Sequence, residues 1–218
     1  FAEELLIKEN IQYAIFVQNG YIIDSTNNDL KLFKAYDNAK FVLSISNDTT
    51  KCIKLKFPGL KTKIVKVSYS IDLGKINFKK KKNLITYMSR KLPQHSNLVT
   101  SYLKPRLNIK WKLKNLQNLS EKDTYENLRK SKIFLSFSSL EGLGLPPVEA
   151  ALAGNYVIGY TGEGGNEYWQ NPLFTRINSG EINKFVLKIV EKVNRNTKKM
   201  NYKKNHLKKI KKIFSKEN

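Results

Sequence analysis

The 218-residue sequence is poor in the residues that build disulfides and metal centres. Its single cysteine, Cys52, excludes an internal disulfide, and with only two histidines, His95 and His206, no zinc-ligand spacing can be assembled. We therefore expect neither a metal nor a cofactor in its chemistry, although residue counting leaves a carboxylate-held magnesium ion open.

Long apolar runs are also missing. None approaches the eighteen residues of a membrane-spanning helix, and the first ten residues, FAEELLIKEN, carry acids where a signal peptide carries bases. These two absences predict a cytoplasmic protein. Since the chain begins at Phe1 without a methionine, we also expect a fragment whose amino-terminal part is missing.

Arginine is scarce, although the formal net charge is +22. A strongly basic chain is commonly a nucleic-acid or membrane-surface binder. Base readout and phosphate clamping, however, depend on arginine forks, and only five arginines are present. Lysine, asparagine and isoleucine are all frequent along the whole chain. This indicates a general compositional bias, with the lysines spread over solvated surfaces. We therefore do not expect nucleic acid as a partner.

Short apolar runs alternate with helical patterns, which predicts an α/β fold with parallel sheets. The first part has expected strands at 13–19, 40–46 and 62–71 and expected helices at 29–39 and 48–57. Asp48 is the expected N-cap of the second helix. A lysine-rich segment, 75–83, has little apolar periodicity and is the best candidate for a linker.

After that segment the alternation restarts and continues to Gly162. Expected strands lie at 83–89, 109–116, 132–139 and 155–162, and expected helices at 96–107, 120–131 and 145–154. Ser120 and Asp123 resemble a capping box at the start of one helix. The sustained alternation predicts a doubly wound parallel sheet.

The carboxy-terminal part, from Glu181 onward, is helical and basic. Its last helix places Leu207, Ile210 and Ile213 in a narrow apolar stripe ringed by lysines. Such a helix can lie on anionic lipid, giving peripheral contact with the inner membrane surface, or can pack its stripe on the fold. Both alternatives stay open.

The stretch SSLEGLGLPPVEAALAG carries the chemistry. A buried strand runs into a turn with Gly142 and Gly144, and a helix then opens with two prolines, which suit a first helical turn. The helix amino terminus at such a turn favours an anion, and a diphosphate is the expected guest. Glu141 precedes the turn and Glu149 follows it, so a diphosphate with hydroxyl-rich groups on both sides, as in a nucleotide sugar, fits the pattern.

The segment TGEGGNEYW follows the next strand. Gly164 and Gly165 are expected to line the same cleft at the carboxyl ends of the strands, although a plain glycine-rich turn has the same composition. Each glutamate of the motif likewise has an ordinary alternative, as a loop carboxylate for Glu141 and as a helix-start carboxylate for Glu149.

The motif EGLGLPPVEAALAGNYVIG resembles the donor-site signature of retaining glycosyltransferases of the GT-B fold, particularly the family-4 group. SEKDTYENLRKSKIFLSFSS and TYMSRK resemble other parts of the donor domain, and NAKFVLSISNDT and KIVKVSYSID resemble the end of the amino-terminal domain. The resemblance implies two Rossmann-like domains. It assigns residues 1–74 to the remainder of the acceptor-side domain, 75–83 to the linker, 84–180 to the donor domain and 181–218 to basic carboxy-terminal helices.

The resemblance also implies roles for individual residues. Glu141 would contact the donor sugar near the reacting centre, Glu149 the nucleotide ribose, and the backbone at Gly142, Leu143 and Gly144 the diphosphate. Arg90 and Lys91 would neutralise the departing diphosphate, so that no metal is required. The family commonly has a lysine several residues after the arginine, where this sequence has Gln94 and His95. The base would lie near residues 116–119.

The implied function is transfer of a sugar from a nucleotide diphospho-sugar to a hydroxyl of an unidentified glycan or lipid-linked acceptor, with retention, in polysaccharide or glycoconjugate synthesis. As a fragment with about half of an amino-terminal domain, the chain is expected to bind donor while lacking turnover. Two alternatives stay open: a non-catalytic nucleotide-binding module, and a basic nucleic-acid or membrane-surface adaptor.

Overall fold

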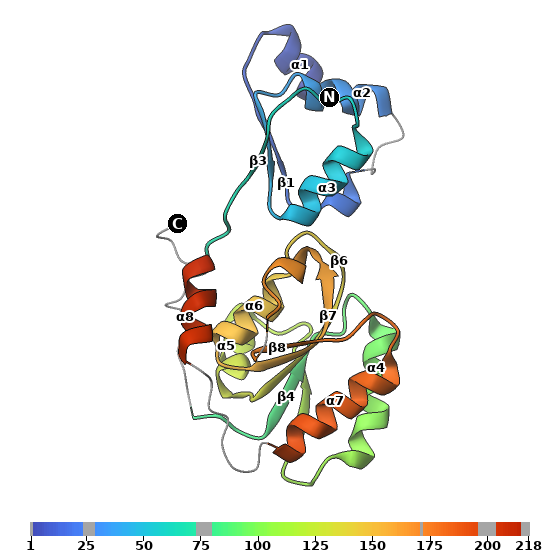
Figure 1. Cartoon of the computed structure of the whole chain (residues 1–218), viewed down its shortest axis with the longest axis vertical. Coiled ribbons are helices and arrows are strands. Elements are labelled where there is room, and N and C mark those ends of the chain that lie inside the picture. Colours follow the sequence, from blue (N-terminus) through green and yellow to red (C-terminus); the bar gives the residue numbers. More distant parts are fainter. Residues whose placement is uncertain (1, 24–28, 73–79, 171, 196–203, 215–218) are drawn as a thin grey trace. The chain divides into compact units, whose positions relative to one another are not determined.

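The computed structural model describes residues 2–23, 29–72, 80–170, 172–195 and 204–214 (Figure 1). Contacts divide the chain into two compact units. The first consists of Phe1–Tyr69 together with Leu140–Leu143 and Glu163–Glu167, and the second of Ser70–Ser139, Gly144–Gly162 and Tyr168–Asn218.

The first unit contains a three-stranded parallel sheet in the order β1-β2-β3. Its strands and helices are α1 (Ala2–Lys8), β1 (Ala14–Val17), α2 (Asp29–Asp37), β2 (Phe41–Ser44), α3 (Asn47–Lys56) and β3 (Ile64–Lys66). Val42 and Ile53, both fully buried, join the sheet to α3 in one apolar core. The predicted N-cap of α3 is wrong, because the Ser46 hydroxyl accepts the Thr49 amide at 3.0 Å and Asp48 lies inside the first turn.

The second unit contains a five-stranded parallel sheet in the order β5-β4-β6-β7-β8. Its strands are β4 (Leu84–Tyr87), β5 (Lys112–Asn115), β6 (Ile133–Glu141), β7 (Tyr156–Glu163) and β8 (Phe174–Arg176). The chain runs from β4 outward to β5 and returns to β6 on the other side of β4. Between β4 and β6 the winding direction reverses, and such a switch point is where ligands bind in open α/β sheets.

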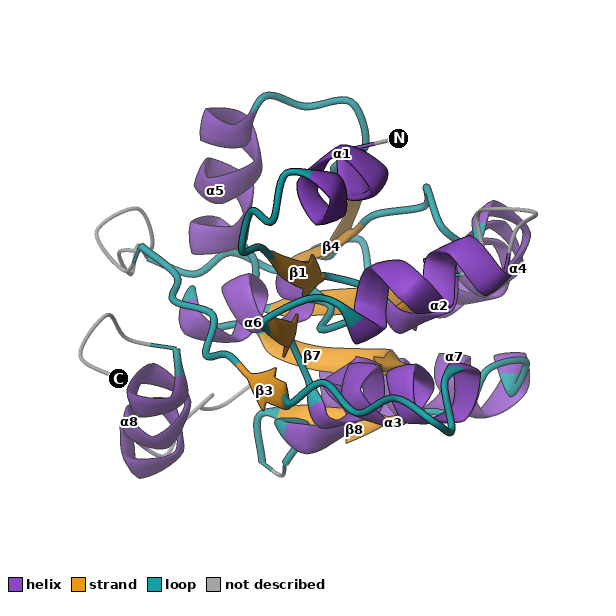
Figure 2. Cartoon of the chain, turned by 90° about the horizontal axis from the view of Figure 1, so that it is seen from above, coloured by secondary structure: helices purple, strands orange, loops and turns teal. Residues whose placement is uncertain are grey.

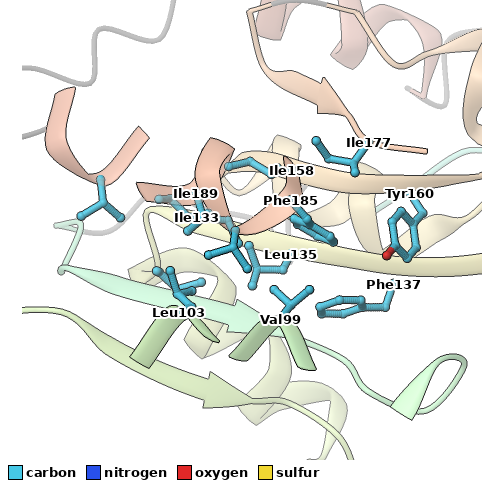
Figure 3. Packing of buried hydrophobic residues seen from close by; sticks show 13 residues of the cluster. Val99, Leu103, Ile133, Leu135, Phe137, Ile158, Tyr160, Ile177, Phe185 and Ile189 are labelled. Carbon is cyan, nitrogen blue, oxygen red and sulfur yellow. The ribbon is translucent and has the colours of Figure 1, made fainter. Parts of the chain in front are cut away.

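Helices cover both faces of this sheet. They are α4 (Pro93–Leu103), α5 (Glu121–Lys130), α6 (Leu145–Leu152) and α7 (Ile182–Arg195). Figures 1 and 2 show α5 and α6 on one side of the strands and α4 and α7 on the other. On the latter side Val99, Leu135, Ile158, Phe185 and Ile189 form part of a closely packed apolar core (Figure 3). The predicted fold class, a doubly wound parallel sheet preceded by a smaller parallel α/β sheet, is confirmed.

Several details differ from the sequence-based expectations. The helix expected from Ser96 begins at Pro93, because proline suits the first helical position and needs no donor there. The helix α1 and the strand β8 were not expected. Residues 75–79 of the predicted linker lie outside the described residues, and residues 80–83 lead directly into β4.

A polar network joins the carboxyl ends of α5 and α6. The Asn155 side-chain amide donates to the carbonyls of Leu128 (2.8 Å) and Ala150 (2.9 Å), and Lys81 Nζ donates to those of Leu128 (3.2 Å) and Ala153 (2.6 Å). Burial lowers the pKa of Lys81 to about 7. These bonds satisfy last-turn carbonyls and fix the two helices side by side.

The helix α8 (Lys204–Ile213) packs on the second unit through two residues of its predicted apolar stripe, whereas the third, Ile213, is 40% exposed. Leu207, Ile210 and Phe214 are buried, and the Phe214 ring meets the Tyr168 ring edge-on at 5.6 Å. This is the packing alternative for the stripe, and contact of the exposed lysines with anionic lipid stays a prediction. In the part of the chain that the structure describes, no helix combines the length and apolarity needed to cross a bilayer.

Candidate functional site

The strand β6 leads through a glycine turn into α6 at the carboxyl edge of the second sheet. Gly144 is the N-cap of α6 and adopts a left-handed conformation (φ 76°, ψ 70°), which glycine tolerates without the penalty of a Cβ. No side chain caps this helix. Because Pro146 and Pro147 have no N–H, the donor amides at this end come from the turn and from Leu145. The turn therefore offers backbone donors for an anion.

A buried tyrosine, Tyr168, hydrogen-bonds the backbone of this turn. The Tyr168 hydroxyl donates to the Gly144 carbonyl at 2.6 Å, and Tyr168 is only 2% exposed. Its ring packs edge-on against Phe174 at 5.6 Å, so the hydroxyl is fixed in place. Sequence reasoning did not identify Tyr168, because it lies 24 positions from Gly144.

Two of the predicted donor-binding glycines are in direct backbone contact. A Cβ added to Gly164 would lie 2.0 Å from the Gly142 carbonyl oxygen, far inside van der Waals distance. Gly165 is buried beside it in the short 3-10 helix Gly164–Glu167. Glycine is thus required at Gly164 by close approach of two turns. The flanking Glu141 is the last residue of β6 and is half-buried.

The predicted site residues fall into two groups. Glu141, Gly142, Leu143, Gly164 and Gly165 belong to the first unit, and the second unit holds Arg90, Lys91, Gly144 and Glu149. The structure brings Gly142 and Gly164 together in the first group. In the second group it pairs Glu149 with a residue that the sequence analysis did not single out.

The loop after β4 carries the predicted basic pair. The side chains of Arg90 and Lys91 are exposed there. Next to them, Ser89 hydrogen-bonds Gln117 and accepts the Asn115 side-chain amide at 2.8 Å. The basic loop is therefore tied to the loop after β5, which is where the base is predicted to bind.

His95 lies at the same edge of the sheet. It is the third residue of α4, and its Nδ1 is 3.1 Å from the Tyr160 hydroxyl of β7, with the two rings edge-on at 5.7 Å. Tyr160 is 2% exposed, and burial raises its pKa. The contact places the imidazole beside Tyr160, the fifth of the eight residues of β7.

Glu149 lies one turn into α6 and accepts a hydrogen bond from the Tyr125 hydroxyl of α5 at 2.8 Å. Burial raises the pKa of Glu149; the bond from Tyr125 opposes that shift, and the negative charge of Glu121 adds to it. Sequence reasoning identified Glu149 but missed Tyr125, because nothing local marks it. Among the described residues, no cluster of three or more histidine, cysteine, aspartate or glutamate side chains could hold a metal ion.

No protein-family model matches the sequence, and no curated protein matches it significantly. The structure is nevertheless similar to solved glycosyltransferases. One is a mutant of S. aureus TarM in complex with fondaparinux, α-GlcNAc-glycerol and UDP (15% identity, TM-score 0.70, covering 94% of this chain and 48% of that one). Another is the pneumococcal O-GlcNAc transferase GtfA with UDP and GlcNAc (15%, 0.62, 97% and 51%).

A third similar structure is sucrose-phosphate synthase from Thermosynechococcus elongatus (10% identity, TM-score 0.70, covering 98% of this chain and 67% of that one). The chain spans about half the length of TarM and GtfA. These neighbours have the GT-B fold with Rossmann-like domains, and the chain shares that fold over nearly all of its length.

Proposed function

We propose that the chain binds a nucleotide diphospho-sugar and takes part in transfer of its sugar to an acceptor hydroxyl, with retention at the anomeric carbon. The observation that carries the proposal is the glycine turn between β6 and α6. Its left-handed Gly144 and its two prolines leave backbone amides of the turn as donors at the carboxyl edge of a doubly wound sheet. A diphosphate is the anion that suits such a turn.

Different residues contact different parts of the nucleotide sugar. The turn amides at Gly142, Leu143 and Gly144 hold the diphosphate, and Glu149 accepts a ribose hydroxyl. Glu141 contacts the sugar and stabilises positive charge on its ring as the bond to the diphosphate lengthens. Gly164 and Gly165, which follow β7, allow their segment of the chain to approach the glycine turn closely.

In the transfer step, the bond from the anomeric carbon to the diphosphate oxygen breaks, and its electron pair leaves with the diphosphate. Arg90 and Lys91 supply positive charge for that leaving group, so the step needs no metal ion. The acceptor oxygen forms the new bond to the anomeric carbon on the face that the diphosphate leaves, and its proton passes to a diphosphate oxygen.

The acceptor is a glycan or lipid-linked hydroxyl met by the first unit, in polysaccharide or glycoconjugate synthesis on the cytoplasmic side. The exposed lysines of α8, Lys208, Lys209 and Lys212, provide contact with anionic lipid at the inner membrane surface. Because the chain spans about half of its neighbours, we propose donor binding for this chain and full transfer for the complete enzyme.

A thermal-shift screen with UDP, GDP, ADP and their common sugar conjugates tests this function. We expect one nucleotide series to raise the melting temperature, with the sugar conjugates at least as effective as the diphosphates. If no nucleoside diphosphate stabilises the chain, the proposed function is wrong.

Glu141→Ala separates an enzyme from a non-catalytic binding module. The substitution is made in the complete enzyme, for which full transfer is proposed. If Glu141 takes part in chemistry, the variant retains nucleotide affinity and loses sugar release from the stabilising donor. Equal release by the variant and the unmodified enzyme would show that Glu141 takes no part, and no release by the unmodified enzyme would support the binding module.

A further inference from the structure

The hydrogen bond between Tyr125 and Glu149 joins two helices at corresponding places. Tyr125 is the fifth residue of α5 and Glu149 the fifth residue of α6, and the hydroxyl donates to Oε1 at 2.8 Å. Among the described residues, no hydrogen bond reaches the other carboxylate oxygen, Oε2. A half-buried carboxylate with one protein donor therefore keeps one oxygen available for a ligand.

Both ends of α5 are fixed, so the position of Tyr125 is well determined. At the start, the Ser120 hydroxyl accepts the Asp123 amide at 3.1 Å and donates to the Asp123 carboxylate at 2.7 Å. Leu128 is fully buried, and its carbonyl accepts the Asn155 side-chain amide beyond the end of the helix. A tyrosine on such a support can hold a partner in one orientation.

We propose that Tyr125 is a positioning residue for the nucleotide ribose: its hydroxyl occupies Oε1 of Glu149 and turns Oε2 toward a single ribose hydroxyl. This inference rests on the proposed function, because Glu149 must face the ribose. The inference goes beyond the proposed function, because it predicts that only one of the two ribose hydroxyls interacts with Glu149.

The charge state agrees with this arrangement. An ionised carboxylate accepts hydrogen bonds from hydroxyls and cannot donate, so the Tyr125 bond favours the form that a ribose hydroxyl needs. Without Tyr125, burial and the nearby Glu121 carboxylate would act unopposed to raise the pKa of Glu149. The tyrosine thus supports both the orientation and the ionisation of the acceptor.

The test uses isothermal titration calorimetry with UDP, GDP and ADP, followed by the 2′-deoxy and 3′-deoxy forms of the nucleotide that binds most tightly. For the unmodified chain we expect one deoxy form to bind about ten-fold more weakly than the ribonucleotide and the other to bind equally. In Tyr125→Phe, the ribonucleotide should weaken by about ten-fold, while the sensitive deoxy form should not weaken further.

Tyr102→Phe is the matched control, because Tyr102 is 45% exposed on α4, and it should leave all affinities unchanged. Glu149→Gln provides a second variant should Tyr125→Phe not fold; it keeps an acceptor for Tyr125 but replaces an oxygen by an amide, and it should lose the preference for the ribonucleotide.

Two results would overturn the inference while the proposed function stands: unchanged ribonucleotide binding in Tyr125→Phe, or equal weakening of all three nucleotides, which indicates a structural role. Failure of the unmodified chain to bind UDP, GDP or ADP would overturn the proposed function, and the inference with it.

Discussion

Replacing Gly144 by alanine tests the glycine turn directly. Gly144 has φ 76°, and an L-residue in the left-handed region costs about 1–2 kcal/mol. For a chain of this size that cost lowers the melting temperature by about 2–8 °C. The added methyl group also lies on the turn whose amides are proposed to meet the diphosphate. Gly144→Ala should therefore weaken binding of the stabilising nucleoside diphosphate by about ten-fold or more.

Gly180→Ala is the control for backbone strain. Gly180 has φ 88°, and nothing lies within 4 Å of an added Cβ, so the same conformational cost arises without a clash at a residue that is not part of the turn. Differential scanning fluorimetry should give similar losses of melting temperature for both variants, whereas calorimetry should show weakened nucleotide binding for Gly144→Ala alone. Equal nucleotide affinity of the two variants would refute the assignment of the turn.

Three further substitutions probe the framework. Gly159→Ala should lower the free energy of unfolding by about 2–3 kcal/mol in urea titrations, because the Cβ would lie 2.1 Å from the Ser136 carbonyl oxygen; an unchanged midpoint would contradict this. Tyr168→Phe should cost about 1 kcal/mol in the same titrations through loss of the bond to Gly144, and full wild-type stability would show that the bond contributes nothing. Lys81 has a pKa lowered from its ordinary 10.5 to about 7, so between these values the unfolded chain holds a proton that the folded chain lacks, and stability rises with pH. Lys81→Met should flatten that rise, by up to about 1.4 kcal/mol per pH unit, and a slope that persists in the variant would contradict this account.

Local patterns were sufficient for most of the elements of the fold. The buried part of β6, Ile133–Phe137, reads as an apolar run that only Ser136 interrupts, and the spacing of Phe185, Ile189 and Val193 marks the inner face of α7. Helix starts were less certain, because Ser46 and Asp48 are both good caps and only the backbone conformation decides between them. The strand β8, with three residues, carries too little periodicity to be recognised.

In the candidate site too, local sequence patterns predict some features and miss others. The turn at Gly142 and Gly144 was predictable, since a strand, glycines and a proline-led helix follow one another in the sequence. The bonds of Tyr125 to Glu149 and of Tyr168 to Gly144 each join residues 24 positions apart. Such pairs depend on how helices pack across the sheet, and no local pattern encodes them. The roles assigned to Glu141, Arg90 and Lys91 stay predictions.

The most direct test of diphosphate binding by the glycine turn is to titrate the ¹⁵N-labelled chain with UDP, GDP and ADP and to follow the assigned backbone amide resonances. We predict that one of these nucleotides, at saturation, shifts the amides of Gly142, Leu143, Gly144 and Leu145 most strongly. Absence of shifts with all three, or shifts confined to the lysine-rich surface of α8 that vanish with added salt, would contradict it.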